Sequence, residues 1–340
     1  TPLVTPVLAG ITAQIVGLAN FTHSIVCMQS TSPHLLVVGS VAIDWIITPH
    51  AERQESVGGS ATFFAMAASY FSRVRLVGVV GGDFPGATVA DLRERGVDLT
   101  GLEIVSDGKT FRWKGRYHEN MNDRTTLATD LNVFEHFVPK LPPAFRGSEY
   151  LFLANIQPGL QEQVFRQMQG PRLVGLDTMN LWISIANPEL LSVLKHVDVL
   201  TLNDEEARQL TGEHNLVKAA RGVQKLGPKN VVVKRGESGA LLFDHAGDVF
   251  AAPALPLEEV TDPTGAGDCF AGGFMGYLAR PGVEPSGASL RTAMIYGSVM
   301  ASFCVEGFSY DRLRGLDSAS IQHRFEAFSS LTNFTRASLL

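Results

Sequence analysis

The stretch Thr-Asp-Pro-Thr-Gly-Ala-Gly-Asp-Cys-Phe-Ala-Gly-Gly-Phe, residues 261–274, is the most informative part of this chain. A glycine-rich turn, Gly265-Ala266-Gly267, leads into the carboxylate of Asp268 and then into an apolar run of small residues. Glycine permits backbone angles that turn successive N–H groups toward one concave surface. A helix that starts at Asp268 would direct its unpaired N–H groups and its positive dipole end to the same point. The stretch therefore predicts an anion site, whose common occupant is phosphate.

Asp268 is a negative charge beside a predicted anion site, which is unfavourable unless the side chain has chemical work to do. Removing a proton from an attacking hydroxyl is such work. The alternative is that Asp268 only caps the helix, because aspartate is a good N-cap and glycine-rich loops precede many helices. The turn by itself leaves both interpretations open.

Composition bounds the class of protein. The chain has 340 residues, 45% hydrophobic and 18% charged, so it is globular, with one large domain or two smaller ones. Its net charge of −6 argues against nucleic acid or an anionic membrane as the main partner. The three cysteines, Cys27, Cys269 and Cys304, have no metal-site spacing and an odd count, which favours a reducing, cytoplasmic compartment. Cys269 is interpreted as a small buried thiol rather than a nucleophile.

Residues 1–33 differ from the rest because they contain no Asp, Glu, Lys or Arg. They lack the basic start and dense apolar core of a signal peptide, and their apolar density is too low for a spanning helix. We expect an N-terminal extension outside the fold, with a weak membrane anchor as the alternative.

From residue 34 onward, short apolar runs alternate with stretches of helical spacing. Runs typical of buried strands occupy residues 35–38, 76–80, 150–153, 173–176, 197–202 and 231–233, and helical stretches occupy 59–71, 87–95, 205–210, 216–226 and 291–303. This alternation predicts an α/β domain over residues 34–330 whose mostly parallel sheet is covered on both faces, followed by a tail at 331–340.

Residues 109–117 alternate strictly between two kinds of side chain. Phe111, Trp113 and Tyr117 fall on one face, and Arg112, Lys114 and Arg116 fall on the other. With residues 124–131 as a partner strand, this predicts a small antiparallel hairpin inserted into the α/β body. Such a hairpin is either a lid over a site or an ordinary edge hairpin with a solvated cationic face.

Polar residues follow several of the predicted strands, where open parallel sheets bind ligands. They are Asp44, the pair Gly58-Gly59, Asn203 with Glu206, and Gly236 with Gly239. Each has a plainer interpretation, such as a turn or, for Asn203 and Glu206, a capping box. Together with the turn at 265–268, they offer the oxygen ligands and N–H donors that a Mg²⁺–nucleotide requires.

In their order, these motifs resemble the ribokinase-like (PfkB) family of sugar and nucleoside kinases over roughly residues 34–330. The matching segments are Val38–Asp44, Gly58-Gly59, Asn203–Glu206, Val233–Gly239 and Asp262–Asp268. The resemblance implies a three-layer α/β/α sandwich with a small β-sheet lid at about residues 99–131. It also implies transfer of the ATP γ-phosphoryl group to a hydroxyl of a sugar or polyol.

The resemblance also implies roles for residues. Asp268 would be the catalytic base, and the N–H groups of Gly265, Ala266 and Gly267 would form the anion hole. Substrate-binding residues would be Asp44, Gly58, Gly59, Arg112 and Trp113, and nucleotide-binding residues would be Asn203, Lys234, Gly236, Gly239 and Thr264. Glu206 would hold Mg²⁺ through water, and Asp262 falls where some members bind a monovalent cation such as K⁺. Members are often homodimers joined through their lids, although an open monomer is equally compatible with this sequence.

Two departures bear on the substrate. Ser60-Ala61-Thr62-Phe63-Phe64 stands where many sugar kinases carry an Asn, and Ala42 occupies a position that is often polar in ribokinases. Both weaken the case for ribose and keep a nucleoside as the second candidate. A catalytically silent, kinase-like binding protein is a further alternative. A dinucleotide-dependent dehydrogenase fits poorly, because the first strand is not followed by G-x-G-x-x-G.

Overall fold

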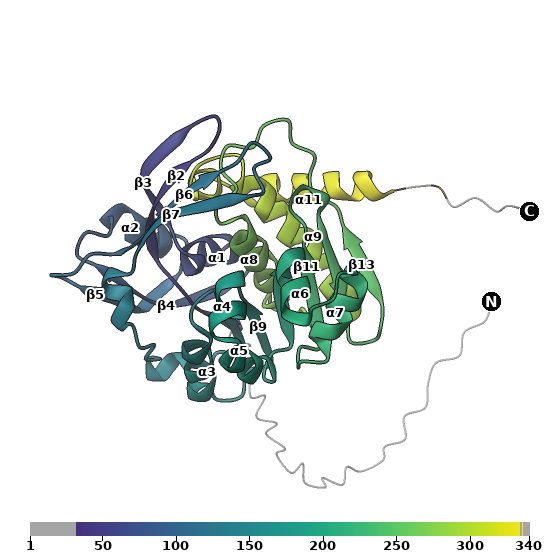
Figure 1. Ribbon diagram of the computed structural model, residues 1–340, viewed down its shortest axis with the longest axis horizontal. Coiled ribbons are helices and arrows are strands. Elements are labelled where there is room, and N and C mark those ends of the chain that lie inside the picture. The colour runs from purple at the N-terminus through teal and green to yellow at the C-terminus, as the bar shows by residue number, and fades with distance from the viewer. Residues whose placement is uncertain (1–31, 334, 336–340) are drawn as a thin grey trace, which may run out of the picture. The chain divides into compact units, whose positions relative to one another are not determined.

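The computed structural model describes residues 32–333 and 335, and this part contains a large and a small β-sheet (Figure 1). The strands of the large sheet lie in the order β13 (Val249–Ala252), β12 (Ala240–Phe243), β11 (Asn230–Lys234), β10 (Val199–Asn203), β9 (Leu173–Asp177), β8 (Tyr150–Leu153), β1 (His34–Val38), β4 (Arg73–Gly81) and β5 (Asp98–Val105). Neighbours from β11 to β5 are parallel, and β12 and β13 add an antiparallel edge. The predicted mostly parallel sheet is confirmed.

Helices cover both faces of this sheet, as strand β1 illustrates. Leu35 and Val37 pack into one hydrophobic cluster, and Leu36 and Val38 pack into the other. Strands buried on both faces are continuous apolar runs, which is the pattern that the sequence shows. The first cluster includes α1 (Ser60–Ala68), α2 (Gly86–Glu94), α8 (Ala266–Leu278), α9 (Gly287–Cys304), α10 (Asp311–Arg314) and α11 (Ser318–Thr332). The second includes α3 (Pro158–Gln167), α4 (Asn180–Ile185), α5 (Asn187–Leu194), α6 (Asp204–Thr211) and α7 (Leu216–Gln224).

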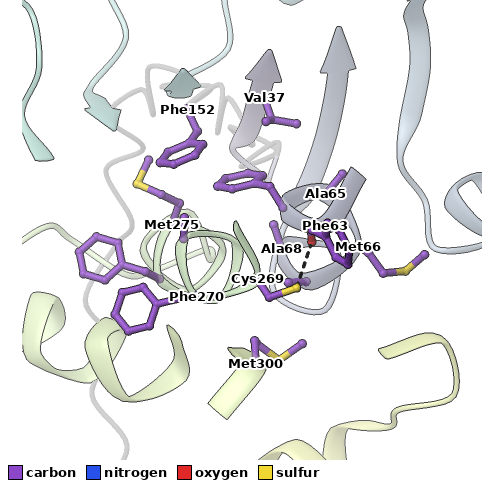
Figure 2. Packing of buried hydrophobic residues seen from close by; sticks show 14 of the residues in the cluster. Val37, Phe63, Ala65, Met66, Ala68, Phe152, Cys269, Phe270, Met275 and Met300 are labelled. Atoms are coloured by element: carbon purple, nitrogen blue, oxygen red, sulfur yellow. Dashed lines mark hydrogen bonds between the residues drawn. The ribbon is translucent and has the colours of Figure 1, made fainter. Parts of the chain in front are cut away.

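Helix α8, which carries most of the 261–274 stretch, packs closely against α1 (Figure 2). A Cβ on Gly272 would lie 2.5 Å from the Phe64 carbonyl oxygen, so the small residues of the motif allow the two helices to approach. The Cys269 thiol is fully buried and donates to the Phe63 carbonyl (3.8 Å). Its interpretation as a small buried thiol is therefore confirmed.

The small sheet, which we call the lid, has the order β3 (Glu52–Gly58), β2 (Ala42–Ile47), β6 (Phe111–Tyr117) and β7 (Arg124–Asp130) (Figure 1). The predicted lid limits of about 99–131 were wrong at their start. Strand β5 pairs with β4 in the large sheet, whereas β2 and β3, far earlier in the chain, join the lid. The predicted antiparallel hairpin exists as β6 and β7, but β6 also pairs in parallel with β2. A single segment cannot reveal this, because the pairing is long-range.

The predicted domain limits concern the two ends of the chain. Residues 1–31, on which the predicted extension and its membrane-anchor alternative fall, lie outside the described residues, as does Cys27. Helix α11 continues to Thr332, beyond the predicted domain end at 330. No helix in the part of the chain from 32 to 333 combines the length and the apolar character needed to cross a membrane.

Candidate active site

The glycine-rich turn forms the N-terminus of α8. The helix begins at Ala266, and its N-cap is Gly265, whose φ of 79° lies in the left-handed region. A Cβ at this position would also overlap the Phe63 ring, so the turn requires glycine. Asp268 is thus the third residue of the helix and not its start, and the N-cap position belongs to Gly265. Both the predicted start and the capping alternative were wrong, because Gly265 rather than Asp268 leaves the helical conformation.

The N–H groups of this turn are not all available to a ligand. The Ala266 N–H donates to the Pro263 carbonyl (3.2 Å), so its predicted place in the anion hole is not supported. Among the described residues, the N–H groups of Gly265 and Gly267 have no such partner. They lie at the positive end of the α8 dipole, which favours an anion.

Lys234 lies directly beside this turn, at the end of β11. Its Nζ donates to Asp177 Oδ2 (2.7 Å), and a Cβ on Gly267 would lie 3.1 Å from that Nζ. Burial disfavours the charge of Lys234, but Asp177 and Glu206 outweigh it and hold the pKa of Lys234 above its ordinary value. The site therefore contains a fixed, charged ammonium group next to the N–H groups.

Asn203 is the last residue of β10, the strand between β9 and β11, and Glu206 lies in the first turn of α6. The Glu206 N–H donates to Asn203 Oδ1 (2.7 Å), and the Asn203 N–H donates to Glu206 Oε2 (2.7 Å). The capping-box interpretation is therefore confirmed. Glu206 is nevertheless buried, and burial raises its pKa to about 7, with Lys234 opposing and Asp177 adding to the rise. A capping bond on a surface helix does not need a buried carboxyl group. The Glu206 carboxylate can therefore have a second role besides capping.

Asp268 lies among the same charges. Burial raises its pKa to about 7; Asp177 adds to this rise, while Lys234 and Arg124 oppose it. A carboxyl with a pKa near neutrality accepts a proton more readily than an ordinary aspartate. The arrangement can therefore bind an anion and take up a proton at one place.

Asp44, on the lid strand β2, is 5% exposed and belongs to this same region. Burial raises its pKa well above the ordinary value, and the charges of Asp262 and Asp268 add to the rise. A Cβ on Gly58 would overlap the Asp44 carboxylate, and Gly59 (φ 93°) precedes α1. The structure thus brings Asp44, Gly58 and Gly59 together, with Asp44 within electrostatic reach of Asp268.

The two predicted substrate residues of β6 have different surroundings. Trp113 pairs with Asp44 across the sheet and so shares its face, and its Nε1 donates to Thr126 Oγ1 (3.1 Å). Arg112 lies on the opposite face, where its guanidinium binds the carboxylates of Glu55 and Asp83. The structure does not bring Arg112 to the site, because these carboxylates hold it outward.

Asp262 and Thr264 precede the turn. Asp262 Oδ1 accepts from the Thr264 N–H (2.9 Å), and Thr264 Oγ1 donates to the Tyr117 hydroxyl of the lid (3.1 Å). Asp262 is 1% exposed, and its Oδ2 has no hydrogen-bond partner within the described part of the chain. A buried, unsatisfied carboxylate oxygen is costly unless a cation or donor completes it.

Gly236 and Gly239 form the turn after β11, with φ of 54° and 79°. A Cβ on Gly236 would overlap the side chain of Asn122 from the β6–β7 turn, and one on Gly239 would overlap the backbone at Ala252. The turn is therefore held close to the tip of the lid.

Comparison with known proteins identifies the family. The profile described as "pfkB family carbohydrate kinase" matches residues 32–311. The chain belongs to the pfkB family. A cytidine kinase from Thermococcus kodakarensis is 32% identical to this pfkB kinase over 251 residues, 72% of this chain and 88% of that protein. A nucleoside kinase from Methanothermobacter thermautotrophicus is 27% identical over 293 residues, 82% and 91% of the two chains. The structure of Arabidopsis thaliana ribokinase with ribose and ATP superimposes with a TM-score of 0.70 at 22% identity, covering 87% of this chain and 99% of that one.

The resemblance inferred from the motifs is thus confirmed, and the protein is a phosphotransferase with an alcohol group as acceptor. Two residues that contact these predicted site residues were not themselves predicted: Asp177, which pairs with Lys234, and Tyr117, which accepts from Thr264. Asp177 ends a buried strand, as Asn203 does, so the same rule would have found it. No comparable local signal marks Tyr117, because its contact with Thr264 depends on how the lid lies over α8.

Proposed function

We propose that this pfkB kinase transfers the γ-phosphoryl group of ATP to a hydroxyl of a sugar or polyol, with Asp268 as the base. The observation that carries the proposal is the position of Asp268. It lies in the first turn of α8, next to the Gly265 and Gly267 N–H groups, with its pKa raised to about 7. These N–H groups and the Lys234 ammonium would contact the phosphates.

The reaction would proceed by direct transfer. The acceptor oxygen forms a bond to the γ-phosphorus while the bond from that phosphorus to the β,γ-bridging oxygen breaks, and ADP leaves with the electron pair. Asp268 takes the proton of the acceptor hydroxyl. Its modest basicity suffices because the transition state is loose and the proton can leave late. Most of the rate acceleration would come from alignment of the acceptor by Asp44 and from stabilisation of the phosphoryl charge by the turn at 265–267.

The residues present fit a Mg²⁺–nucleotide. Glu206 is a buried carboxylate with one oxygen committed to the Asn203 N–H, and it would act on the cation through water. Within residues 32–333, no three His, Cys, Asp or Glu side chains form a ready metal cage, which suits a cation held mainly by phosphate and water oxygens. When bound, Mg²⁺ supplies charge neutralisation on the phosphates.

Asp262 fits a monovalent cation such as K⁺. Its buried Oδ2 lacks a partner among the described residues, and a cation would satisfy it. Titrating K⁺ at constant ionic strength tests this: activation in the wild type that is absent from Asp262→Asn supports the site, and equal responses reject it.

A nucleoside is the second candidate acceptor. The cytidine kinase and the nucleoside kinase above favour it, and so does Trp113, an indole on the same lid face as Asp44 that could stack on a base. An ADP-release screen over sugars, polyols and nucleosides distinguishes the two. Turnover of none of these acceptors would reject the kinase proposal and favour the silent binding protein.

Assembly and compartment are further parts of the proposal. Strand β7 is exposed along its whole length at the edge of the lid, with Leu127 at 43% exposure, which supports a homodimer through the lids. Sedimentation of the wild type and Leu127→Glu tests this, because the substitution should shift a dimer to monomer; an unchanged sedimentation coefficient rejects the lid interface.

Cys269 and Cys304 are free and buried, which supports a reducing, cytoplasmic compartment.

A further inference from the structure

Gln161 is a buried amide on α3, a helix that supplies none of the site residues described above. The buried residues of α3 are Pro158, Gln161 and Val164, whose spacing forms one core-facing stripe. Gln161 is 1% exposed, at a position where a helix normally carries an apolar side chain. Burial of an amide is unfavourable unless it is hydrogen-bonded, so the partners of Gln161 indicate its role.

The Gln161 amide binds the ends of two neighbouring strands. Its Nε2 donates to the carbonyls of Leu153 (3.3 Å) and Ala154 (2.9 Å) at the end of β8, and to that of Asp177 (3.1 Å) at the end of β9. The register of this parallel pair stops one residue earlier, at Leu153 and Leu176. The amide therefore links the two strands at the point where their own pairing ends.

The chemistry of these partners fixes the orientation of the amide. All three are carbonyl oxygens, which only accept, so the NH₂ group faces them and Oε1 points away. Oε1 is buried and has no hydrogen-bond partner among residues 32–333. A buried acceptor without a donor lowers stability, and an apolar side chain would avoid that loss. Stability alone therefore does not favour glutamine at this position.

The backbone of Asp177 is held from two sides. Toward β10 it pairs with Thr201 in the sheet, and toward β8 its carbonyl accepts from Gln161. Its carboxylate accepts from the Thr178 N–H (2.8 Å) through Oδ1 and from Lys234 Nζ (2.7 Å) through Oδ2. The position at which Asp177 leaves the sheet thus decides where its carboxylate meets Lys234.

The charge of Asp177 acts beyond this ion pair. Burial raises the pKa of Asp268, and the Asp177 charge raises it further. Burial lowers the pKa of Lys234, and the same charge outweighs that effect. The other charges that face Asp268 are Lys234 and Arg124, which lower its pKa, and Asp44 on β2. A displacement of Asp177 would therefore change the charge balance at Asp268.

We propose that Gln161 is a positioning residue that fixes where Asp177 leaves the sheet, and through Asp177 sets the place of Lys234 and the charge balance at Asp268. Gln161 acts only through Asp177 and exchanges no proton. The catalytic consequence rests on the proposed function, in which Asp268 is the base and Lys234 contacts the phosphates.

The titration of Asp268 in the free protein tests this without turnover. Carbon-13 NMR of labelled aspartate carboxyl groups follows it, and the signal missing from Asp268→Asn identifies Asp268. Gln161→Met keeps the length of the side chain but donates no hydrogen bond, so Asp177 should move away from Lys234. The pKa of Asp268 should then fall by at least about 0.5 pH units, because a negative charge recedes and Lys234 is less compensated. An unchanged pKa would overturn the inference.

Gln167→Met is the matched control on the same helix. Gln167 also forms amide hydrogen bonds, to the Pro139 carbonyl (2.9 Å) and the Leu141 N–H (3.0 Å), but these hold a connecting segment and not a strand end. This variant should leave the pKa of Asp268 as in the wild type. Equal shifts in the two variants would overturn the inference in favour of a general loosening of α3.

Asp177→Asn shows whether Gln161 acts through Asp177. Loss of the Asp177 charge should itself lower the pKa of Asp268, and adding Gln161→Met should lower it no further, since both changes act through one group. A further fall as large as that of the single variant would contradict the proposed route. If Gln161→Met does not fold, Gln161→Asn, whose amide is one methylene shorter, provides the same comparison.

The pH dependence of kcat/KM separates this inference from the proposed function. If Asp268 is the base, the pH of half-maximal kcat/KM in Gln161→Met should fall as far as the pKa of Asp268 does. A shifted titration with an unshifted kcat/KM profile would support the positioning of Asp177 and reject Asp268 as the base. A shift in neither, with Asp268→Asn inactive, would overturn the inference alone.

Discussion

Lys234 and Asp177 form an ion pair (Nζ to Oδ2, 2.7 Å) between the ends of two strands that flank β10. The side chains are only 19% and 6% exposed. The pair lies next to Gly267, so one interaction joins the carboxyl edge of the sheet to the N-terminus of α8. It holds a positive charge beside Gly267, at the N-terminus of α8.

Removing one partner of this pair should destabilise the fold. Lys234→Met leaves the buried Asp177 without its cation, which should lower the free energy of unfolding by about 3 kcal/mol. The matched control is Lys229→Met, which breaks a pair with Asp198 just before the starts of β11 and β10. Lys229 is 69% exposed, so its loss should cost less than about 1 kcal/mol. Urea denaturation measures both, and equal losses would contradict a stabilising role for the buried pair.

Replacing the proposed base should affect turnover much more than nucleotide binding. Asp268→Asn keeps the size of the side chain but cannot accept the proton, so kcat should fall more than about 10²-fold while ATP affinity stays within a few fold. Steady-state kinetics and calorimetry measure the two quantities. Turnover like that of the wild type would remove Asp268 from the mechanism.

The raised pKa of Asp268 makes both activity and stability depend on pH. The base form is required, so kcat/KM should rise about tenfold per pH unit below pH 7 and level off above it. The pKa of Asp268 is about 7 in the folded protein and about 4 in the unfolded chain. Asp268 therefore contributes to the free energy of unfolding at low pH, and this contribution is lost as the pH rises through 7. Asp268→Asn should therefore stabilise the protein at pH 8 by about 2–4 kcal/mol, and by less toward pH 5. The free energies of unfolding of the wild type and Asp268→Asn, measured by denaturation at pH 5 and pH 8, check this. A difference between the two proteins that does not change with pH would argue against the raised pKa.

Glu206 should set the Mg²⁺ requirement. Glu206→Gln keeps an oxygen to accept the Asn203 N–H but loses the charge that would act on the cation, so half-maximal activity should need several-fold more Mg²⁺. The neighbouring Glu205 is exposed, and Glu205→Gln serves as the control. Mg²⁺ titrations at saturating ATP measure the effect. Superimposable curves for the two variants would leave Glu206 only its capping role.

Gly58 should control access of the acceptor to Asp44. In Gly58→Ala the new methyl would overlap the Asp44 carboxylate, so KM for the acceptor should rise about tenfold or more while KM for ATP changes little. Gly86→Ala is the control, since a Cβ there meets nothing within 4 Å. Initial rates with either substrate varied distinguish the two sides of the site. An equal rise in both KM values would indicate general distortion of the lid.

Much of the fold was predictable because its signals are local. Leu35–Val38 and Val231–Val233 are continuous apolar runs, and only strands buried on both faces need such runs. The glycine-rich turn before α8 was likewise predictable, because the left-handed conformation of Gly265 tolerates few other residue types. The limits of the lid were not predictable, since β2 pairs with β6 across more than 60 residues of chain.

The sequence by itself determined the family, the parallel sheet and the anion turn, because each depends on residue types at fixed spacing. It also put Trp113 and Arg112 on opposite faces of one strand. Only the tertiary structure decided which of these faces looks toward Asp44, that Lys234 is paired with Asp177, and that Tyr117 of the lid binds Thr264 beside the anion turn. These relationships depend on the packing of segments that are distant in the chain, and burial among those segments, rather than residue type, raises the pKa of Asp268 to about 7.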